Sequence, residues 1–270
     1  MSAKERLDRL LVERKLAPSR QRARTLIMAG KVVVDEERVE KPGAQIRPDA
    51  HIRLKGEDCP FVSRGGLKLE RALDVFGIDP RGKTAIDVGA STGGFTDCLI
   101  QRGARRVFAV DVGYGQLAWK LQQDARVVNL ERRNIRYLDF AEIGEPVDLI
   151  VVDTSFISVE KFLHRLCDMV REDGGIVILI KPQFEVGKGV VEKGGIVRDH
   201  EAHKRVVERI RQEARRVGLE TRGVVESPLR GPKGNREFFI HLISCEGRGM
   251  VSQDRESASR HGPAESTETG

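Results

Sequence analysis

Cysteine is scarce in this chain, which has four thiols among 270 residues. They stand far apart, at Cys59, Cys98, Cys167 and Cys245, and no two of them form a CxxC pair. Because zinc sites and disulfide frameworks use closely spaced cysteines, this spacing predicts inert thiols. The histidines show no ligand spacing beside an acidic cluster, so we expect no metal site.

Long apolar runs are missing as well. No stretch approaches the roughly 20 apolar residues of a membrane-spanning helix, and the first residues lack the apolar core of a signal peptide. We therefore expect a cytoplasmic protein without a membrane partner. Separately, we expect it to be a monomer. The hydrophobic fraction of 39% and the charged fraction of 33% are ordinary for a globular protein. The length suits one medium domain with a smaller one.

A surplus of acidic residues is absent, since the net charge is +6. Residues 1–56 hold 14 Lys and Arg against 8 Asp and Glu, so this segment carries the whole surplus. A basic module joined to a near-neutral one favours a polyanionic partner, and nucleic acid comes ahead of lipid because no amphipathic anchor accompanies it. A merely solvated basic surface is the alternative that charge alone leaves open.

What the N-terminal segment does contain is a helix pair followed by short strands. Apolar residues on one face mark residues 6–12 as a first helix, and Ser19 caps a second helix that ends at Gly30. Apolar runs at 31–34 and 51–54, separated by proline-containing turns, predict strands. The segment is therefore a small α+β domain.

Arg20, Arg22 and Arg24 fall near the start of the second helix. Cations at a helix N-terminus oppose the helix dipole, so local stability does not explain them and a bound phosphate backbone would.

The same segment resembles the RNA-binding module of ribosomal protein S4. The resemblance rests on the Ser-Arg pair at 19–20, on Gly-Lys-Val at 30–32 and on Lys-Pro-Gly at 41–43. It implies an RNA-binding domain over residues 1–56, with an interdomain linker at 57–62. The RNA contacts expected along the whole chain are Arg6, Arg20, Arg22, Arg24, Lys31, Lys41, Arg64, Lys188 and Lys233.

A glycine-rich turn follows the buried apolar run that contains Asp87. Gly89, Gly93 and Gly94 let the backbone turn tightly into a helix, where bare N–H groups can approach a ligand. The spacing is not that of the dinucleotide fingerprint, because Ser91 stands where the second glycine would be. A tight connection without a ligand is the alternative for such a loop on its own.

Asp111 ends the next apolar run, where nucleoside-binding folds keep a carboxylate for the ribose hydroxyls. Together with the glycine turn, it favours S-adenosylmethionine over a nicotinamide cofactor. The expected cofactor-binding residues are Asp87, Gly89, Ala90, Ser91, Gly93, Gly94, Phe95, Asp111 and Asp153.

Strand and helix signals alternate from residue 63 to residue 245. This alternation predicts an α/β fold with a doubly wound, Rossmann-like sheet of seven strands, in which ligands bind beyond the carboxyl ends of the strands. We expect residues 159–172 to form one of the helices and residues 116–123 another. Residues 246–270 are polar and predict a disordered tail.

Two apolar runs end in a charge, one at Asp153 and one at Lys181. A charge directly after a buried strand is costly unless it is paired with an opposite charge or has a role in binding or catalysis. A lysine facing a carboxylate would satisfy both conditions. An ordinary structural salt bridge is the alternative.

Residues 61–245 resemble ribose 2′-O-methyltransferases of the FtsJ type. The resemblance rests on four motifs, at 63–68, 152–158, 181–188 and 234–239. It implies a catalytic tetrad of Lys68, Asp153, Lys181 and Glu237. The order of modules is similar to that of the TlyA family, which implies methylation of the 2′-hydroxyl of cytidine in ribosomal RNA of the small or large subunit, or both.

Methyl transfer to a ribose hydroxyl needs lysines and carboxylates such as those of the tetrad. A ribose hydroxyl is a very weak acid, so Lys181 would accept its proton or stabilise the forming alkoxide, while the carboxylates hold the lysines. The glycine-rich stretch at 184–197 reads as a mobile loop or as a plain surface excursion. We expect Tyr114 and Trp119 to pack in the core rather than stack on a base. A non-catalytic RNA-binding factor is the competing interpretation, ahead of a haemolysin.

Overall fold

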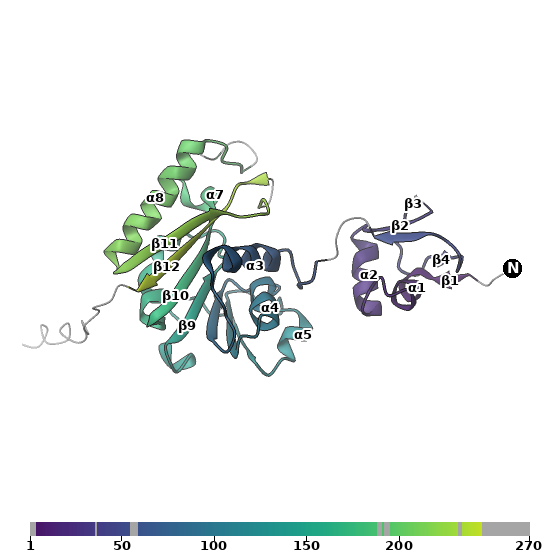
Figure 1. Cartoon of the computed structure of the whole chain (residues 1–270), viewed down its shortest axis with the longest axis horizontal. Coiled ribbons are helices and arrows are strands. Elements are labelled where there is room, and N and C mark those ends of the chain that lie inside the picture. Colours follow the sequence, from purple (N-terminus) through teal and green to yellow (C-terminus); the bar gives the residue numbers. More distant parts are fainter. Residues whose placement is uncertain are drawn as a thin grey trace, which may run out of the picture. The chain divides into compact units, whose positions relative to one another are not determined.

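The computed structural model describes residues 4–35, 37–54, 59–187, 191, 195–231 and 234–244. The chain forms two compact units, Met1–Pro60 and Phe61–Gly270. Figure 1 shows both, with elements labelled where there is room and coloured along the sequence.

The N-terminal unit packs two helices against short strands. Helices α1 (Leu7–Glu13) and α2 (Arg20–Met28) share a core with strands β2 (Val32–Val34) and β5 (Ile52–Leu54). β2 pairs antiparallel with β5 and with β3 (Glu37–Arg38), and β1 (Glu5–Arg6) pairs with β4 (Gln45–Ile46). The side chain of Ser19 accepts a hydrogen bond from the backbone N–H of Arg22, so the predicted cap of the second helix is confirmed.

A buried carboxylate links the two helices of this unit. Asp8 on α1 has no exposed surface, and it accepts hydrogen bonds from Arg6 at 3.0 Å and from Arg20 at 3.1 Å. The hydrogen bond from Arg6 is the largest cause that lowers the pKa of Asp8 to about 2. The expectation that local stability gives no reason for the arginines at the start of α2 is thus wrong for Arg20, because this arginine compensates a buried charge.

The second unit is built on one sheet of seven strands in the order β11-β12-β10-β9-β6-β7-β8. The five strands from β10 to β8 run parallel, and β12 runs antiparallel to both β10 and β11. The strands are β6 (Thr84–Val88), β7 (Arg106–Asp111), β8 (Val127–Glu131), β9 (Val147–Val152), β10 (Val170–Ile180), β11 (Leu219–Glu226) and β12 (Phe238–Ser244). The predicted doubly wound sheet of seven strands is confirmed.

Helices cover both faces of this sheet (Figure 1). One layer contains α3 (Gly65–Phe76), α4 (Gly94–Gln101) and the short α5 (Trp119–Gln122). The other contains α6 (Leu163–Met169) and α8 (His200–Arg216), whose apolar side chains join a large core cluster with strand residues such as Ile150 and Ile178. Short helical turns follow β9 and β10, at η2 (Val159–Lys161) and α7 (Pro182–Glu185), and η1 (Phe140–Glu142) precedes β9. Within the sheet, β10, β9 and β6 are parallel neighbours, so their carboxyl ends lie side by side.

One predicted helix is shorter than expected. Residues 159–172 form η2 and α6 and then enter β10, because the buried Val170 takes an extended conformation and pairs with Val147. The sheet register shifts between Val170 and Gly175, so the polar residues after Val170 belong to an irregular part of the strand. Propensity alone does not reveal such a long-range pairing.

The buried carboxylate of Asp8 should set the acid stability of the N-terminal unit. Because its pKa in the folded state lies near 2, below the ordinary value of 3.8, its contribution is complete above pH 4 and is lost as the pH falls from 4 towards 2. We expect Asp8→Asn to lower the free energy of unfolding by about 1 to 3 kcal/mol at pH 7 and by less at pH 3. Urea titrations at both pH values measure this difference.

The control is Glu13→Gln, which removes the exposed pair between Arg9 and Glu13 on the same helix. This variant should stay within about 0.5 kcal/mol of the wild type. An equal effect of the two substitutions would contradict the structural role of Asp8.

Candidate active site

The backbone of the glycine turn after β6 packs closely against the backbone that follows β9. Gly89 has a φ of +84°, and a Cβ on it would lie 2.7 Å from the carbonyl oxygen of Asp153, so only glycine fits without strain. Asp111, at the end of β7, accepts hydrogen bonds from the N–H groups of Ser91 and Gly113, both at 2.7 Å. Asp111 thus holds the turn in place, and each of its oxygens keeps a free lone pair for a ligand.

Asp87 lies below this turn and is fully buried. Its Oδ2 accepts hydrogen bonds from the N–H and the hydroxyl of Thr96, at 2.8 and 2.7 Å. Its Oδ1 has no hydrogen-bond partner among the described residues. Burial is the main cause that raises the pKa of Asp87 to about 7, with smaller contributions from Asp153 and Asp111. A buried carboxylate with an unused oxygen is suited to a cationic or hydrogen-bond-donating ligand group.

The four tetrad residues form two ion pairs. Nζ of Lys181, directly after β10, lies 2.5 Å from Oδ1 of Asp153, directly after β9, and 2.9 Å from the hydroxyl of Ser155. Nζ of Lys68 on α3 lies 2.6 Å from Oε2 of Glu237, just before β12. The predicted pairing of Asp153 with Lys181 follows from adjacent parallel strands, in which Val152 stands opposite Ile178.

Both pairs open on one cavity, which we call the tetrad cavity, of about 340 Å³. Arg64 and the loop residue Arg230 also line it, and both are exposed. Gly231 lines it too, and a Cβ there would lie 1.9 Å from Oε1 of Glu237. The absence of a side chain at Gly231 therefore makes room for the carboxylate of Glu237.

A second cavity, the Asp111 cavity, of about 460 Å³, lies beside the first. The two share Gly89, Ser91, Asp153 and Ser155 as lining residues. The structure thus brings all nine expected cofactor-binding residues to one region, at or next to these cavities. The residues that line either cavity are Asp87, Gly89, Ala90, Ser91, Gly94, Phe95, Asp111 and Asp153, and Gly93 precedes α4 in the same turn.

Phe156 is a site residue that the sequence reasoning missed. It lines the Asp111 cavity, its residue surface is 89% exposed, and its φ is +67°, which is strained for a bulky residue. Its ring contacts that of Phe184, with 4.9 Å between centroids. Only its place inside the motif at 152–158 could have drawn attention to this residue from the sequence.

The expectation that Tyr114 and Trp119 pack in the core is wrong. Their exposed fractions are 69% and 68%, because the chain after β7 runs over the surface before α5. The guanidinium of Arg132 lies 4.2 Å from the centre of the Tyr114 ring, and that of Arg136 lies 5.0 Å from the ring of Tyr137. Both arginines and their rings are exposed, and Arg133, Asn134 and Ile135, which lie between the two arginines in the sequence, line the Asp111 cavity.

The expected RNA contacts are spread over both units. Arg20 and Arg24 line a surface hollow on α2, whereas Arg22 donates a hydrogen bond to the carbonyl of Cys59. Lys31 is half-buried and Lys41 is exposed. The expected contacts Lys188 and Lys233 lie outside the described residues.

Comparison with known proteins agrees with this architecture. Residues 61–243 match the model of the FtsJ-like methyltransferase family, and residues 5–52 match that of the S4 domain. A solved S-adenosylmethionine-dependent methyltransferase from Listeria monocytogenes shares the fold, with a TM-score of 0.52 at 14% identity over 67% of this chain and 99% of that one. The chain belongs to the FtsJ-like methyltransferase family, and it is an enzyme of the methyltransferase class.

Two relatives that align with most of the chain show to which branch of this family it belongs. The chain is 45% identical over 259 residues to the 16S/23S rRNA (cytidine-2′-O)-methyltransferase TlyA of Mycobacterium tuberculosis, covering 96% of this chain and 97% of that one. A solved structure described as a hemolysin of Streptococcus thermophilus is 42% identical, with a TM-score of 0.71 over 91% of this chain and 90% of that one. The chain belongs to the TlyA family.

The name hemolysin among these relatives raises the question of membrane insertion. In the part of the chain that the structure describes, no helix is long and apolar enough to cross a bilayer.

The buried carboxylate of Asp87 should lower the stability of the ligand-free protein at high pH. Its pKa is raised to about 7, so its charged form is disfavoured and stability falls as the pH rises from 4 to 7. We expect Asp87→Asn to raise the free energy of unfolding above pH 7 by about 1 to 3 kcal/mol, and to have little effect near pH 4.5. Denaturant titrations across this pH range test the trend.

Glu145→Gln, an exposed substitution in the same unit, serves as the control and should show no such trend. A loss of stability for Asp87→Asn at pH 8 would show that the charged form of Asp87 is satisfied, contrary to the geometry.

Proposed function

We propose that the chain transfers a methyl group from S-adenosylmethionine to the 2′-hydroxyl of a cytidine ribose in ribosomal RNA. The observation that carries the proposal is the convergence of two lysine–carboxylate pairs, Lys68–Glu237 and Lys181–Asp153, on one cavity beside the Asp111 cavity. The substrate is that of the TlyA relative from Mycobacterium tuberculosis, to which nearly the whole chain aligns.

The residues around the two cavities suit the cofactor. Asp111 would accept hydrogen bonds from the ribose hydroxyls. Asp87 lines the tetrad cavity, and its Oδ1, which has no hydrogen-bond partner among the described residues, would suit an ammonium group. Gly89 leaves the turn bare, so that a ligand can approach the backbone closely. When bound, S-adenosylmethionine supplies an electrophilic methyl group on a sulfonium.

The tetrad would handle the proton and the developing charge. As the 2′-oxygen forms its bond to the methyl carbon, the bond of that carbon to sulfur would break, the sulfur would leave as a neutral thioether, and the O–H bond would break. Lys181 accepts that proton in its neutral form, or stabilises the alkoxide in its ammonium form. Asp153 and Ser155 fix Nζ of Lys181 at one point, while Lys68, held by Glu237, adds positive charge at the same cavity. Orientation of this kind is worth about 7 to 11 kcal/mol in favourable cases.

RNA binding by this chain would use both units. The N-terminal segment carries the basic surplus of the chain and matches the S4 domain. In the second unit, the exposed rings of Tyr114 and Tyr137 beside Arg132 and Arg136 are of the kind on which unpaired bases stack. The target cytidine must leave its helix for the ribose to enter a cavity, so stacking partners near the site favour this reaction.

The first test supplies radiolabelled S-adenosylmethionine and unmodified ribosomal subunits to the purified protein and maps any 2′-O-methyl product. Lys181→Ala should lower the rate by at least about 100-fold, because the group that handles the proton is lost. Lys204→Ala, which removes an exposed lysine on α8, is the matched control and should keep the wild-type rate.

Each outcome bears on the proposal. Label on cytidine ribose that depends on Lys181 supports it, and the labelled subunit defines the substrate. Binding of RNA without any transfer of label to either subunit would favour a non-catalytic RNA-binding factor instead.

Phe156 should contribute to RNA binding rather than to folding. Phe156→Gly removes an exposed ring with its contact to Phe184, but it also relieves a positive φ, so the free energy of unfolding should change by less than about 1 kcal/mol. Loss of stacking on one base should raise the KM for the ribosomal substrate about 10-fold, with a smaller change in kcat. Initial rates at varied subunit concentration measure both constants, and Val75→Ala on α3 is the exposed apolar control. An unchanged KM would remove Phe156 from the RNA contact.

A further inference from the structure

The segments that follow β9 and β10 are joined near the sheet and again further out. Close to the strands, Lys181 contacts Asp153 at 2.5 Å and Ser155 at 2.9 Å. Further out, the rings of Phe156 and Phe184 lie 4.9 Å apart between centroids. The contacts follow the same order along both segments. A residue that lies further from the end of β9 contacts a residue that lies further from the end of β10.

Glu185 makes the outermost contact of this series. It ends α7, its residue surface is 6% exposed, and its Oε1 accepts a hydrogen bond from the backbone N–H of Val159 at 3.0 Å. Val159 begins η2, the first regular turn after Asp153. The two segments therefore form a closed unit, with the Asp153–Lys181 ion pair at one end and the Glu185–Val159 hydrogen bond at the other.

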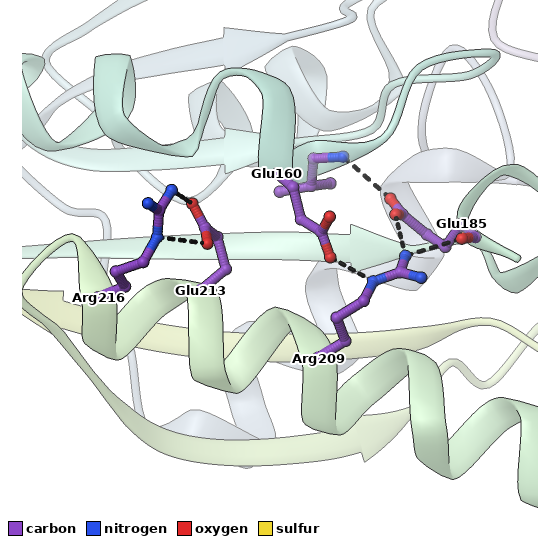
Figure 2. A network of polar contacts seen from close by, with 6 residues as sticks. Glu160, Glu185, Arg209, Glu213 and Arg216 are labelled. Carbon is purple, nitrogen blue, oxygen red and sulfur yellow. Dashed lines mark hydrogen bonds and ion pairs between the residues drawn. The ribbon is translucent and has the colours of Figure 1, made fainter.

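Arg209 on α8 supports this outer contact (Figure 2). Its Nη2 donates to the backbone carbonyl of Glu185 at 2.7 Å and lies 3.3 Å from Oε2 of the same residue, while its Nε contacts Glu160. One guanidinium thus holds the end of α7 and the start of η2 against a long, well-packed helix. Farther along α8, Glu213 and Arg216 pair with each other alone in the same view.

A carboxylate is an expensive choice for this place. Burial is the largest influence on the pKa of Glu185 and raises it, against the hydrogen bond from Val159 and the charge of Arg209. An apolar side chain of similar size would fill the same space without the cost of removing a charge from water. What an apolar side chain cannot supply is an acceptor for the N–H of Val159.

We propose that Glu185 is a positioning residue for Lys181: its hydrogen bond to Val159 fixes the segment 153–159 against α7, and so holds Nζ of Lys181 beside Asp153 and Ser155. This inference rests on the proposed function, in which Lys181 acts on the reacting 2′-hydroxyl. A displacement of about 1 Å at a reacting group can cost about 100-fold in rate.

The test compares two substitutions in the full chain. Glu185→Leu removes the acceptor, whereas Glu185→Gln keeps a carbonyl oxygen for Val159. We expect Glu185→Leu to lower kcat about 10- to 100-fold, with a KM for ribosomal subunits within about 3-fold of the wild type. Glu185→Gln should stay within about 3-fold of the wild-type kcat. Rates are measured at 20 °C, with circular dichroism of each variant to confirm the folded fraction.

Glu213→Gln is the matched control, because it removes a carboxylate partner of an arginine on the same helix away from the site. It should keep the wild-type kcat. A wild-type kcat for folded Glu185→Leu would overturn the proposal, and so would a loss for Glu185→Gln as large as that for Glu185→Leu. If Glu185→Leu does not fold, a loss of kcat above 10-fold in Glu185→Gln alone contradicts the proposal.

Hydrogen–deuterium exchange separates this inference from the proposed function. The amides of residues 153–159 should exchange faster in Glu185→Leu than in the wild type, with no change in Glu213→Gln. If the wild type itself transfers no methyl group to RNA, the proposed function has failed, and unchanged exchange in Glu185→Leu would show that the positioning contact has failed as well.

Discussion

The ion pair between Lys181 and Asp153 is the interaction around which the second unit is arranged. Each charge follows a buried strand, and each would be costly at that place without the other. Their meeting requires β9 and β10 to be parallel neighbours, and this pairing fixes where the connecting helices cross. The glycine turn after β6 then comes to lie against the backbone of Asp153, so the residues expected to bind the cofactor and those expected to be catalytic meet at the carboxyl ends of neighbouring strands.

The two units divide the work by charge. Residues 1–56 carry the net positive charge of the chain, and part of it compensates the buried Asp8 instead of facing a ligand. The second unit is near neutral in sequence, yet it gathers Lys68, Arg64 and Arg230 around one cavity. Under the proposed function, different residues would attract a polyanion over a long range and stabilise a forming negative charge locally.

Sequence reasoning predicted the fold and much of the candidate site because these features repeat along the chain or stand at strand ends. The alternation of elements, the glycine turn and the terminal charges at Asp153 and Lys181 are local signals. Other features depend on residues that are distant in the sequence, so no local pattern predicts them. They are the Glu185–Val159 contact, the exposure of Tyr114 and the entry of residue 170 into β10. The role of each tetrad residue stays a prediction, carried by resemblance and geometry.

The partners Lys68 and Glu237 are 169 positions apart, and Glu237 precedes the last strand of the sheet. During synthesis, a ribosome releases the chain from its N-terminus onward, so α3 emerges long before β12 can insert between β10 and β11. A nascent chain therefore cannot pair Lys68 with Glu237 until the residues just before β12 have been synthesised. A chain that stops before this antiparallel strand would lack the carboxylate that holds the first lysine, so the tetrad cavity is completed last.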